Sequence, residues 1–178
     1  MHHPIHVPIS ILVINLFVFS KIYTAIMSSK ALQMSPVFYG ISMLPKESWK
    51  EYGFALLTIA GSDGDVSDPE LEWLTIELAE AVGVEESIIS EWEEFNYDDA
   101  DLREIFTSIN ARSFVSYSKL LIYDAIRMAS ADDDYAEEEK EKVMEAAGLL
   151  KVSKESVIAI ESLIELEHAA EKLRMLIL

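Results

Sequence analysis

From residue 45 onward, apolar residues recur every three or four positions, the spacing that places them on one face of a helix. No segment of this part alternates apolar and polar residues with the period of two that a strand requires. The chain has 6 glycines and 5 prolines among 178 residues, too few for the turns of a many-stranded sheet. The pattern predicts an all-α fold of about seven helices, over residues 46–61, 68–82, 88–95, 99–109, 114–128, 136–147 and 153–178.

Local signals predict where several of these helices begin and end. Ser67 and Glu70 have the spacing of a capping box at the start of the second helix, and Gly83 is placed to end it. Asp98 is expected to cap the fourth helix. Gly148 is expected to end the sixth helix, because glycine adopts the left-handed conformation that closes many helices.

Residues 1–42 differ from the rest of the chain in composition. They contain Lys21 and Lys30 but no acidic residue, and residues 9–19 form a mainly apolar run. This run alone is too short to span a bilayer. Residues 5–27 reach spanning length only by including Lys21, which costs about 2.5 to 3.5 kcal/mol on insertion. We therefore predict a hydrophobic N-terminal segment, residues 1–42, that could contact a membrane through residues 5–27.

Three interpretations of this N-terminal segment stay open: a signal or membrane anchor, a hydrophobic helix packed on the domain, and an over-long start followed by a later initiator, Met27, Met34 or Met43. In each case residues 43–178 form the helical domain. We expect the protein in the cytoplasm, with association to a membrane only through the N-terminal segment.

The net charge of the chain limits the classes of partner that it can bind. With 14 Lys and Arg against 32 Asp and Glu, the formal net charge is −18, and residues 43–178 alone carry −20. A nucleic-acid ligand is excluded on this basis, because binding a polyanion begins with basic side chains that neutralise phosphates. The absence of cysteine also excludes a disulfide scaffold. The expected partner is a cation or a protein, either basic or membrane-associated.

An internal repeat divides the helical domain. Residues 60–70 align without gaps on residues 129–139, which lie sixty-nine positions later. With a gap of four residues, 78–84 then align on 143–149. Each unit is a helix, an acidic turn, a second helix and a glycine stop. Because neither unit could bury its apolar face alone, the repeat predicts a pseudo-twofold helical bundle.

Each acidic turn places three carboxylates within eight residues at the start of a helix. The candidate metal ligands are Asp63, Asp65, Glu70, Asp132, Asp134 and Glu139. Carboxylate oxygens suit a hard cation, calcium or magnesium, although one turn offers only about three to five of the six to eight oxygens that calcium takes. The turns are not EF-hands, because Leu74 stands where the bidentate Glu would be required. The alternative is that these acids only cap helices and complement their dipoles.

The doubled motif resembles the TerB-like domains of tellurite-resistance proteins over roughly residues 45–170. The residues that carry this resemblance are Ser62-Asp63-Gly64-Asp65-Val66-Ser67-Asp68-Pro69-Glu70 and Ala131-Asp132-Asp133-Asp134-Tyr135-Ala136-Glu137-Glu138-Glu139. The resemblance implies about seven helices, an acidic surface with divalent cation binding, and a role in metal or oxyanion stress or in membrane-linked complexes. The second copy departs from the family pattern at Asp133, where glycine is preferred, and at Ala136, where serine is preferred.

These observations favour a non-enzymatic module of the tellurite-resistance or metal-stress type, which binds divalent cations weakly and serves as a scaffold for protein partners. The alternative is a pure interaction module, similar to the membrane-proximal domain of DnaJ-type co-chaperones, whose His-Pro-Asp signature is absent here. A carboxylate-dependent hydrolase is a third possibility, but no nucleophile–base pair or nucleotide-binding loop occurs. Glu165 and His168 have di-iron spacing only once, which favours a solvated helix face.

Overall fold

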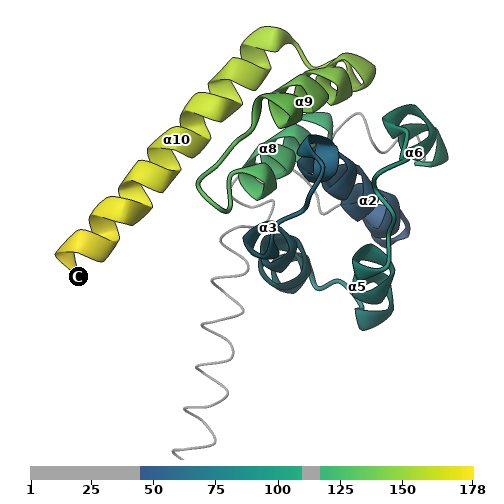
Figure 1. The fold of residues 1–178 in the computed structure, drawn as a ribbon, viewed down its shortest axis with the longest axis horizontal. Coiled ribbons are helices and arrows are strands. Elements are labelled where there is room, and N and C mark those ends of the chain that lie inside the picture. Colours follow the sequence, from purple (N-terminus) through teal and green to yellow (C-terminus); the bar gives the residue numbers. More distant parts are fainter. Residues whose placement is uncertain (1–44, 110–116) are drawn as a thin grey trace, which may run out of the picture. The chain divides into compact units, whose positions relative to one another are not determined.

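The computed structural model describes residues 45–109 and 117–178, which belong to one compact unit, Met43–Leu178 (Figure 1). These residues form helices and no strand, so the prediction of an all-α fold is confirmed. The elements are η1 (Lys46–Ser48), α2 (Trp49–Ala60), η2 (Gly61–Asp63), α3 (Asp68–Glu72), η3 (Trp73–Leu78), α4 (Ala79–Val82), α5 (Glu86–Glu93), α6 (Leu102–Ser108), α8 (Ser118–Ala129), α9 (Glu137–Leu150) and α10 (Lys154–Ile177). Because α3, η3 and α4 follow one another without a break, they form one helix, and the described residues contain seven longer helices.

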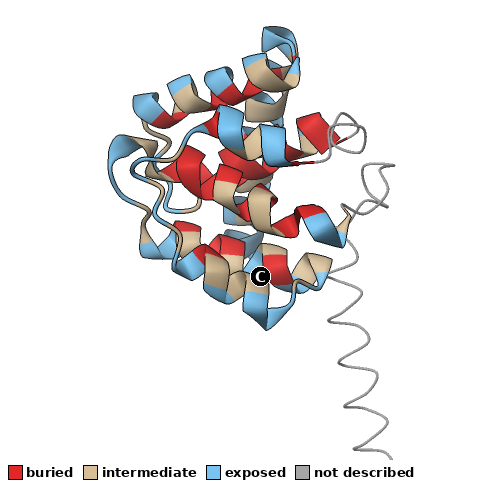
Figure 2. Cartoon of the chain, turned by 90° about the vertical axis from the view of Figure 1, so that its right-hand side faces the viewer, coloured by how far each residue is buried: buried red, intermediate tan, exposed pale blue. Residues whose placement is uncertain are grey.

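Helices α2 and α8 form the centre of the core. They pack against each other, and the remaining helices pack around them, with α5 and α6 on α2 and with α9 and α10 on α8. Most residues of α2 and α8 are buried, and Figure 2 shows the buried segments in the interior of the domain. Gly53 allows a close approach in this core, because a Cβ atom there would lie 2.1 Å from Nε1 of Trp92. The Trp92 indole instead donates a hydrogen bond to the Lys50 carbonyl oxygen at 3.1 Å.

Two of the predicted helix ends are confirmed and two are wrong. The Ser67–Glu70 capping box forms, and Gly83 ends its helix with a φ of 78°. Asp98 does not cap α6. Asp101 does so instead, and its carboxylate accepts a hydrogen bond from the backbone N–H of Arg103 at 2.8 Å.

Gly148 does not end α9, which continues to Leu150. The left-handed residue that closes it is Lys151, with a φ of 57°. The N–H of Val152 donates to the Ala147 carbonyl oxygen at 2.8 Å, so the closing hydrogen bond lies three residues later than the sequence predicts. Gly148 therefore occupies an exposed position inside a helix, with nothing near the place of a Cβ atom.

The repeat is confirmed, but its second half aligns differently from the sequence prediction. Helices α2 and α8 begin sixty-nine residues apart, as do α3 and α9. The helix ends at Gly83 and Lys151, and the starts of α5 and α10, are sixty-eight residues apart. Segment η3 is a π-helix, which contains more residues per turn than an α-helix, and α9 has no counterpart to it. One extra residue in η3 replaces the gap of four residues that the sequence alignment used.

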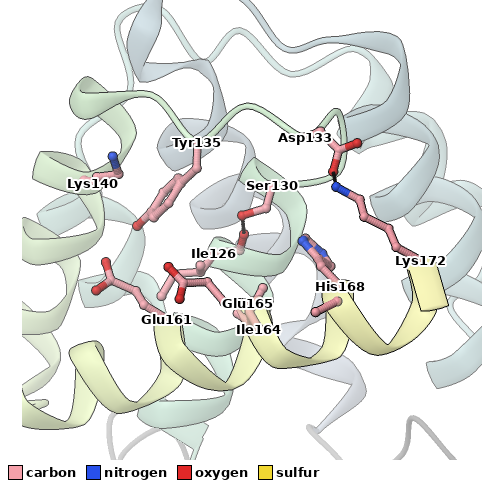
Figure 3. Close-up of a pocket in the computed structure, with 11 residues that line it drawn as sticks. Ile126, Ser130, Asp133, Tyr135, Lys140, Glu161, Ile164, Glu165, His168 and Lys172 are labelled. Atoms are coloured by element: carbon pink, nitrogen blue, oxygen red, sulfur yellow. Dashed lines mark hydrogen bonds and ion pairs between the residues drawn. The ribbon is translucent and has the colours of Figure 1, made fainter.

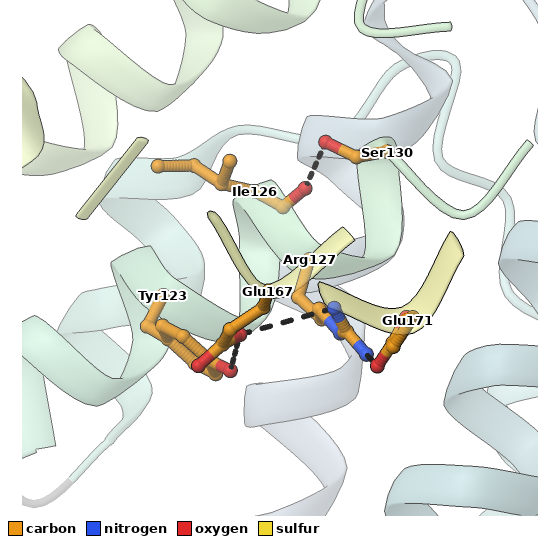
Figure 4. A network of polar contacts seen from close by, with 6 residues as sticks. All are labelled: Tyr123, Ile126, Arg127, Ser130, Glu167 and Glu171. Carbon is orange, nitrogen blue, oxygen red and sulfur yellow. Dashed lines mark hydrogen bonds and ion pairs between the residues drawn. The ribbon is translucent and has the colours of Figure 1, made fainter. Parts of the chain in front are cut away.

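Helix α10 is held on α8 by a polar network (Figure 4). The Arg127 guanidinium lies between two carboxylates of α10, with Nη2 2.8 Å from Oε1 of Glu171 and Nη1 3.8 Å from Oε2 of Glu167. The Tyr123 hydroxyl donates to the same Glu167 oxygen at 2.7 Å. Arg127 is buried, and the Glu171 carboxylate is the main cause that raises its pKa against the opposing effect of burial.

A second polar contact is buried between α2 and α8. The Tyr52 hydroxyl donates to Oδ2 of Asp124 at 2.5 Å, and Asp124 is only 6% exposed. Burial raises the pKa of Asp124 to about 7, because a charged carboxylate is poorly solvated there. The core therefore contains an acid that favours its neutral form.

The N-terminal segment predicted to contact a membrane, residues 1–42, lies outside the described residues, and its boundary at residue 42 stays a prediction. Among the helices that the structure describes, none combines the length and the apolar composition that crossing a bilayer needs.

Candidate functional site

The two acidic turns adopt the same backbone conformation. Gly64 has a φ of 111° and Asp133 has a φ of 69°, so both turns pass through the left-handed region at the equivalent residue. Aspartate tolerates this region better than most residues, and the turn persists despite the loss of glycine. In each turn the first aspartate accepts a backbone hydrogen bond two residues on. Asp65 N–H donates to Asp63 Oδ1 at 3.2 Å, and the equivalent bond to Asp132 is 2.9 Å long.

The last acid of each turn points into the domain. Glu70 is 4% exposed and Glu139 is 3% exposed. Glu70 accepts hydrogen bonds from the backbone N–H of Ser67 at 2.7 Å and from its hydroxyl at 2.8 Å. Glu139 accepts the backbone bond from Ala136 at 2.7 Å but lacks a hydroxyl donor, because alanine replaces serine. The same cap thus anchors both glutamates, with one bond fewer in the second turn.

The carboxyl groups of Glu70 and Glu139 lie within hydrogen-bonding reach of each other. Burial raises the pKa of both groups, and the neighbouring Glu70 charge contributes to raising the pKa of Glu139 to about 8. The two hydrogen bonds from Ser67 stabilise the charged form of Glu70. Burial and the neighbouring Glu70 charge therefore favour the protonated form of Glu139, whereas the Ser67 hydrogen bonds favour the charged form of Glu70.

The four predicted aspartates are all exposed. Two of them act on the buried pair across the repeats, because Asp132 raises the pKa of Glu70 and Asp63 raises that of Glu139. The turns thus lie beside each other, in agreement with the contact between η2 and α9. Asp65 and Asp134 take part in the turns through their backbone N–H groups.

The acidic side chains at this site are chemically suited to a hard cation, but they are not arranged as metal ligands in this structure. Glu70, Glu139, Asp63 and Asp132 supply only carboxylate oxygens, the ligands that calcium and magnesium prefer. Among the described side chains, however, no group of three or more acids, histidines or cysteines is arranged to hold a metal ion. A cation would need Asp63 and Asp132 to turn toward the buried glutamates.

An ion pair between the second turn and α10 had no signal in the sequence. Lys172 Nζ lies 2.8 Å from Oδ1 of Asp133, and this contact lowers the pKa of Asp133. The two residues are thirty-nine positions apart, and both side chains are exposed, so no local pattern could have paired them. The contact links the second acidic turn to the C-terminal helix.

A groove of about 540 Å³ lies beside this ion pair, between the second turn and α10 (Figure 3). Its polar lining has mixed charge and comprises Ser130, Asp133, Tyr135, Lys140, Glu161, Glu165, His168 and Lys172. The Tyr135 hydroxyl points toward the Glu161 carboxylate, and burial is the main cause that raises its pKa. The groove is therefore a polar surface that flanks the acidic turns.

Comparisons with known proteins agree with the all-α fold. The family model described as Tellurite resistance protein TerB matches residues 54–162 of the chain. A solved crystal structure of a tellurite resistance protein from Nostoc punctiforme is similar, with a TM-score of 0.65 and 27% sequence identity over 79% of this chain and 86% of that chain. No curated protein sequence matches.

Proposed function

Because the chain belongs to the TerB family of tellurite resistance proteins, we propose that it is a non-enzymatic stress-response module that binds a hard divalent cation, calcium or magnesium, with modest affinity at its paired acidic turns. The observation that carries this proposal is the contact between Glu70 and Glu139, which brings one buried carboxyl group from each repeat to a single point. Capping a helix requires each glutamate only at its own turn. The convergence of the two is an additional feature.

The chemistry of the pair supports a positively charged ligand. Two carboxylates in contact repel each other unless a proton or a cation lies between them, and two exposed aspartates add to the negative potential. Glu70 and Glu139 would form the inner side of the site, with Asp63 and Asp132 at its entrance. A bound cation would supply the positive charge that the proton supplies otherwise. Since one side of the site faces solvent, we expect modest affinity.

Direct contact between the carboxyl groups also supports a non-enzymatic role. Carboxylate pairs in glycoside hydrolases are about 5 Å or more apart and flank a substrate. Glu70 and Glu139 instead lie within hydrogen-bonding reach of each other and are almost fully buried, so a substrate has little access to them.

The second candidate is an interaction module in which the acids only cap helices and attract a basic partner. The capping contacts of Glu70 and Glu139 favour it, because each glutamate accepts a hydrogen bond from the backbone N–H of the residue that caps its helix. The charge of −20 on residues 43–178 provides the attraction for a basic surface. The two candidates differ in one respect: capping gives no ion specificity.

A thermal-melting experiment separates them. Calcium, magnesium or manganese at millimolar concentration, with ionic strength kept constant with NaCl, should raise the melting temperature of the unmodified chain, because a ligand that binds only the folded state stabilises it. Replacing Asp63 and Asp132 with Asn should abolish this shift and keep the fold. The control is Asp98→Asn with Asp99→Asn, which removes two exposed charges outside the turns and should keep the shift. A melting temperature that none of the three ions changes would leave the acids as helix caps.

A further inference from the structure

Helix α10 has a second apolar face in addition to the one that packs on α8. Its inner face contains Val157 and Ile164, which are buried. Six apolar residues on another face are all exposed: Ala159, Leu163, Leu166, Ala170, Leu173 and Ile177. Leu166 is 69% exposed and Ile177 is 76% exposed, values that are high for large aliphatic side chains. We call these six residues the outer seam.

The spacing of the outer seam is that of a coiled coil. Its residues follow one another at intervals of four, three, four, three and four positions, so apolar side chains repeat at the a and d positions of a heptad. At 100° per residue, the seam lies about 120° around the helix from the face on α8. Figure 1 shows α10 along an outer edge of the domain. A continuous apolar stripe in such a place indicates a surface that binds another helix.

The seam is complementary to itself in the antiparallel direction. If two copies of α10 cross at His168, Leu166 of one copy meets Ala170 of the other, and Leu163 meets Leu173. Each small residue then faces a large one at the centre, and the stripe is covered from Ala159 to Ile177. This alternation of large and small side chains is what lets two helices interdigitate.

The charges along α10 favour the same direction. The side chains of residues 154–168 carry a net charge of −3, with His168 neutral, whereas those of residues 169–178 carry +1. A parallel pair would place the two acidic halves against each other. An antiparallel pair places each acidic half beside a basic one, where Lys172 and Arg174 are located.

The contact area is sufficient for a weak dimer. The seam is about 27 Å long, and half the surface of a helix about 11 Å wide over that length is roughly 470 Å². Two copies would bury about 1,000 Å², the lower limit for a specific interface. We propose that two copies of this chain pair through their outer seams, with the α10 helices antiparallel, and that the dimer dissociates in the micromolar range.

Sedimentation velocity of the full chain, from about 1 to about 100 µM, tests the pairing. Leu166→Glu places two charges at the centre of the interface and should give a monomer, with the helical circular dichroism spectrum unchanged. Ile158→Glu is the matched control, because Ile158 is on α10 and 50% exposed but lies outside the outer seam. This control variant should dimerise like the unmodified chain. A monomer at every concentration, as expected if residues 1–42 cover the seam instead, overturns the proposal.

Disulfide trapping tests the direction, because the chain contains no cysteine of its own. A mixture of the Leu166→Cys and Ala170→Cys chains should form a mixed disulfide on mild oxidation, and neither chain alone should cross-link rapidly. Association driven by residues 1–42 would not select this pair. Rapid cross-linking of the Leu166→Cys chain with itself indicates parallel helices and contradicts the antiparallel arrangement.

Discussion

Replacing Asp124 with Asn should change how the stability of the domain depends on pH. Asp124 is buried between α2 and α8 and accepts a hydrogen bond from the Tyr52 hydroxyl at 2.5 Å. Burial raises its pKa from 3.8 to about 7, although the Tyr52 hydrogen bond opposes this shift. The folded state therefore prefers the neutral acid over a pH range in which the unfolded chain prefers the carboxylate.

The sign and the size of the effect follow from this difference. Below about pH 4, Asp124 is protonated in both states and costs nothing. As the pH rises, the unfolded chain releases the proton first, so the free energy of unfolding falls until the folded state also ionises near pH 7. A difference of about three pKa units corresponds to roughly 4 kcal/mol at 1.36 kcal/mol per unit. Asp124 should therefore contribute a loss of about this amount between pH 4 and pH 8.

Urea denaturation of both proteins from pH 4 to pH 8 measures this loss. Asn keeps an oxygen that accepts the Tyr52 hydrogen bond but has no charge to gain. Its buried amide N–H groups cost about 1 to 3 kcal/mol at every pH. Asp124→Asn should therefore be the less stable protein at pH 4 and equal or better at pH 8. The difference between the two proteins isolates Asp124, because Glu139 titrates in both.

Tyr52→Phe provides an independent check. Without the hydroxyl, the charged form of Asp124 loses its hydrogen bond, and the fall in stability should extend to higher pH. If the difference in unfolding free energy between the unmodified protein and Asp124→Asn stays constant from pH 4 to pH 8, the pKa of Asp124 is not raised in the folded state.

Two further predictions concern helix ends and the core. Gly148→Ala should stabilise the domain by about 0.5 to 1 kcal/mol, because Gly148 lies inside α9 with open space at the place of a Cβ atom. Lys151→Gly should also stabilise it, by up to about 1 kcal/mol, because the backbone of Lys151 is left-handed. Urea denaturation measures both effects. A loss of stability in either variant would contradict the end of α9 at Leu150. Leu121→Ala should cost about 2 to 5 kcal/mol, because Leu121 is fully buried on α8. Glu93 is exposed, so Glu93→Ala should change the free energy of unfolding by less than about 0.5 kcal/mol in the same assay. Similar losses in Leu121→Ala and Glu93→Ala would show that burial does not determine these costs.

Short-range patterns in the sequence were enough to predict the helices and the repeat. Apolar periodicity acts over one or two turns, and a capping box acts over four residues, so the start of α3 at Ser67 could be predicted correctly. The ungapped alignment of the turns also predicted that Asp133 would occupy the place of Gly64, and both are left-handed. Each of these features depends on a few neighbouring residues whose preferences agree.

Where two local signals for a helix end competed, tertiary packing determined which one the structure uses. Asp98 and Asp101 are both suitable caps, and the start of α6 depends on how Leu102 enters the core. Gly148 is a typical stop signal, but α9 continues to Leu150, and the left-handed residue that closes it is Lys151, three residues later. Continuing the helix costs about 1 kcal/mol at glycine, and the packing of the helix overrides so small a preference.

The contacts that define the candidate site exist only in the folded domain. The sequence predicted that Glu70 and Glu139 are equivalent, but their proximity requires the acidic turns of the two repeats to lie beside each other. Tertiary packing also decides two other features, the extra residue in the π-helix η3 and the buried hydrogen bond between Tyr52 and Asp124. Pairs so far apart in sequence have no local preference for each other. They meet because burying the apolar faces of both repeats in one core leaves a single way to place the backbone, and the polar groups must find partners within it.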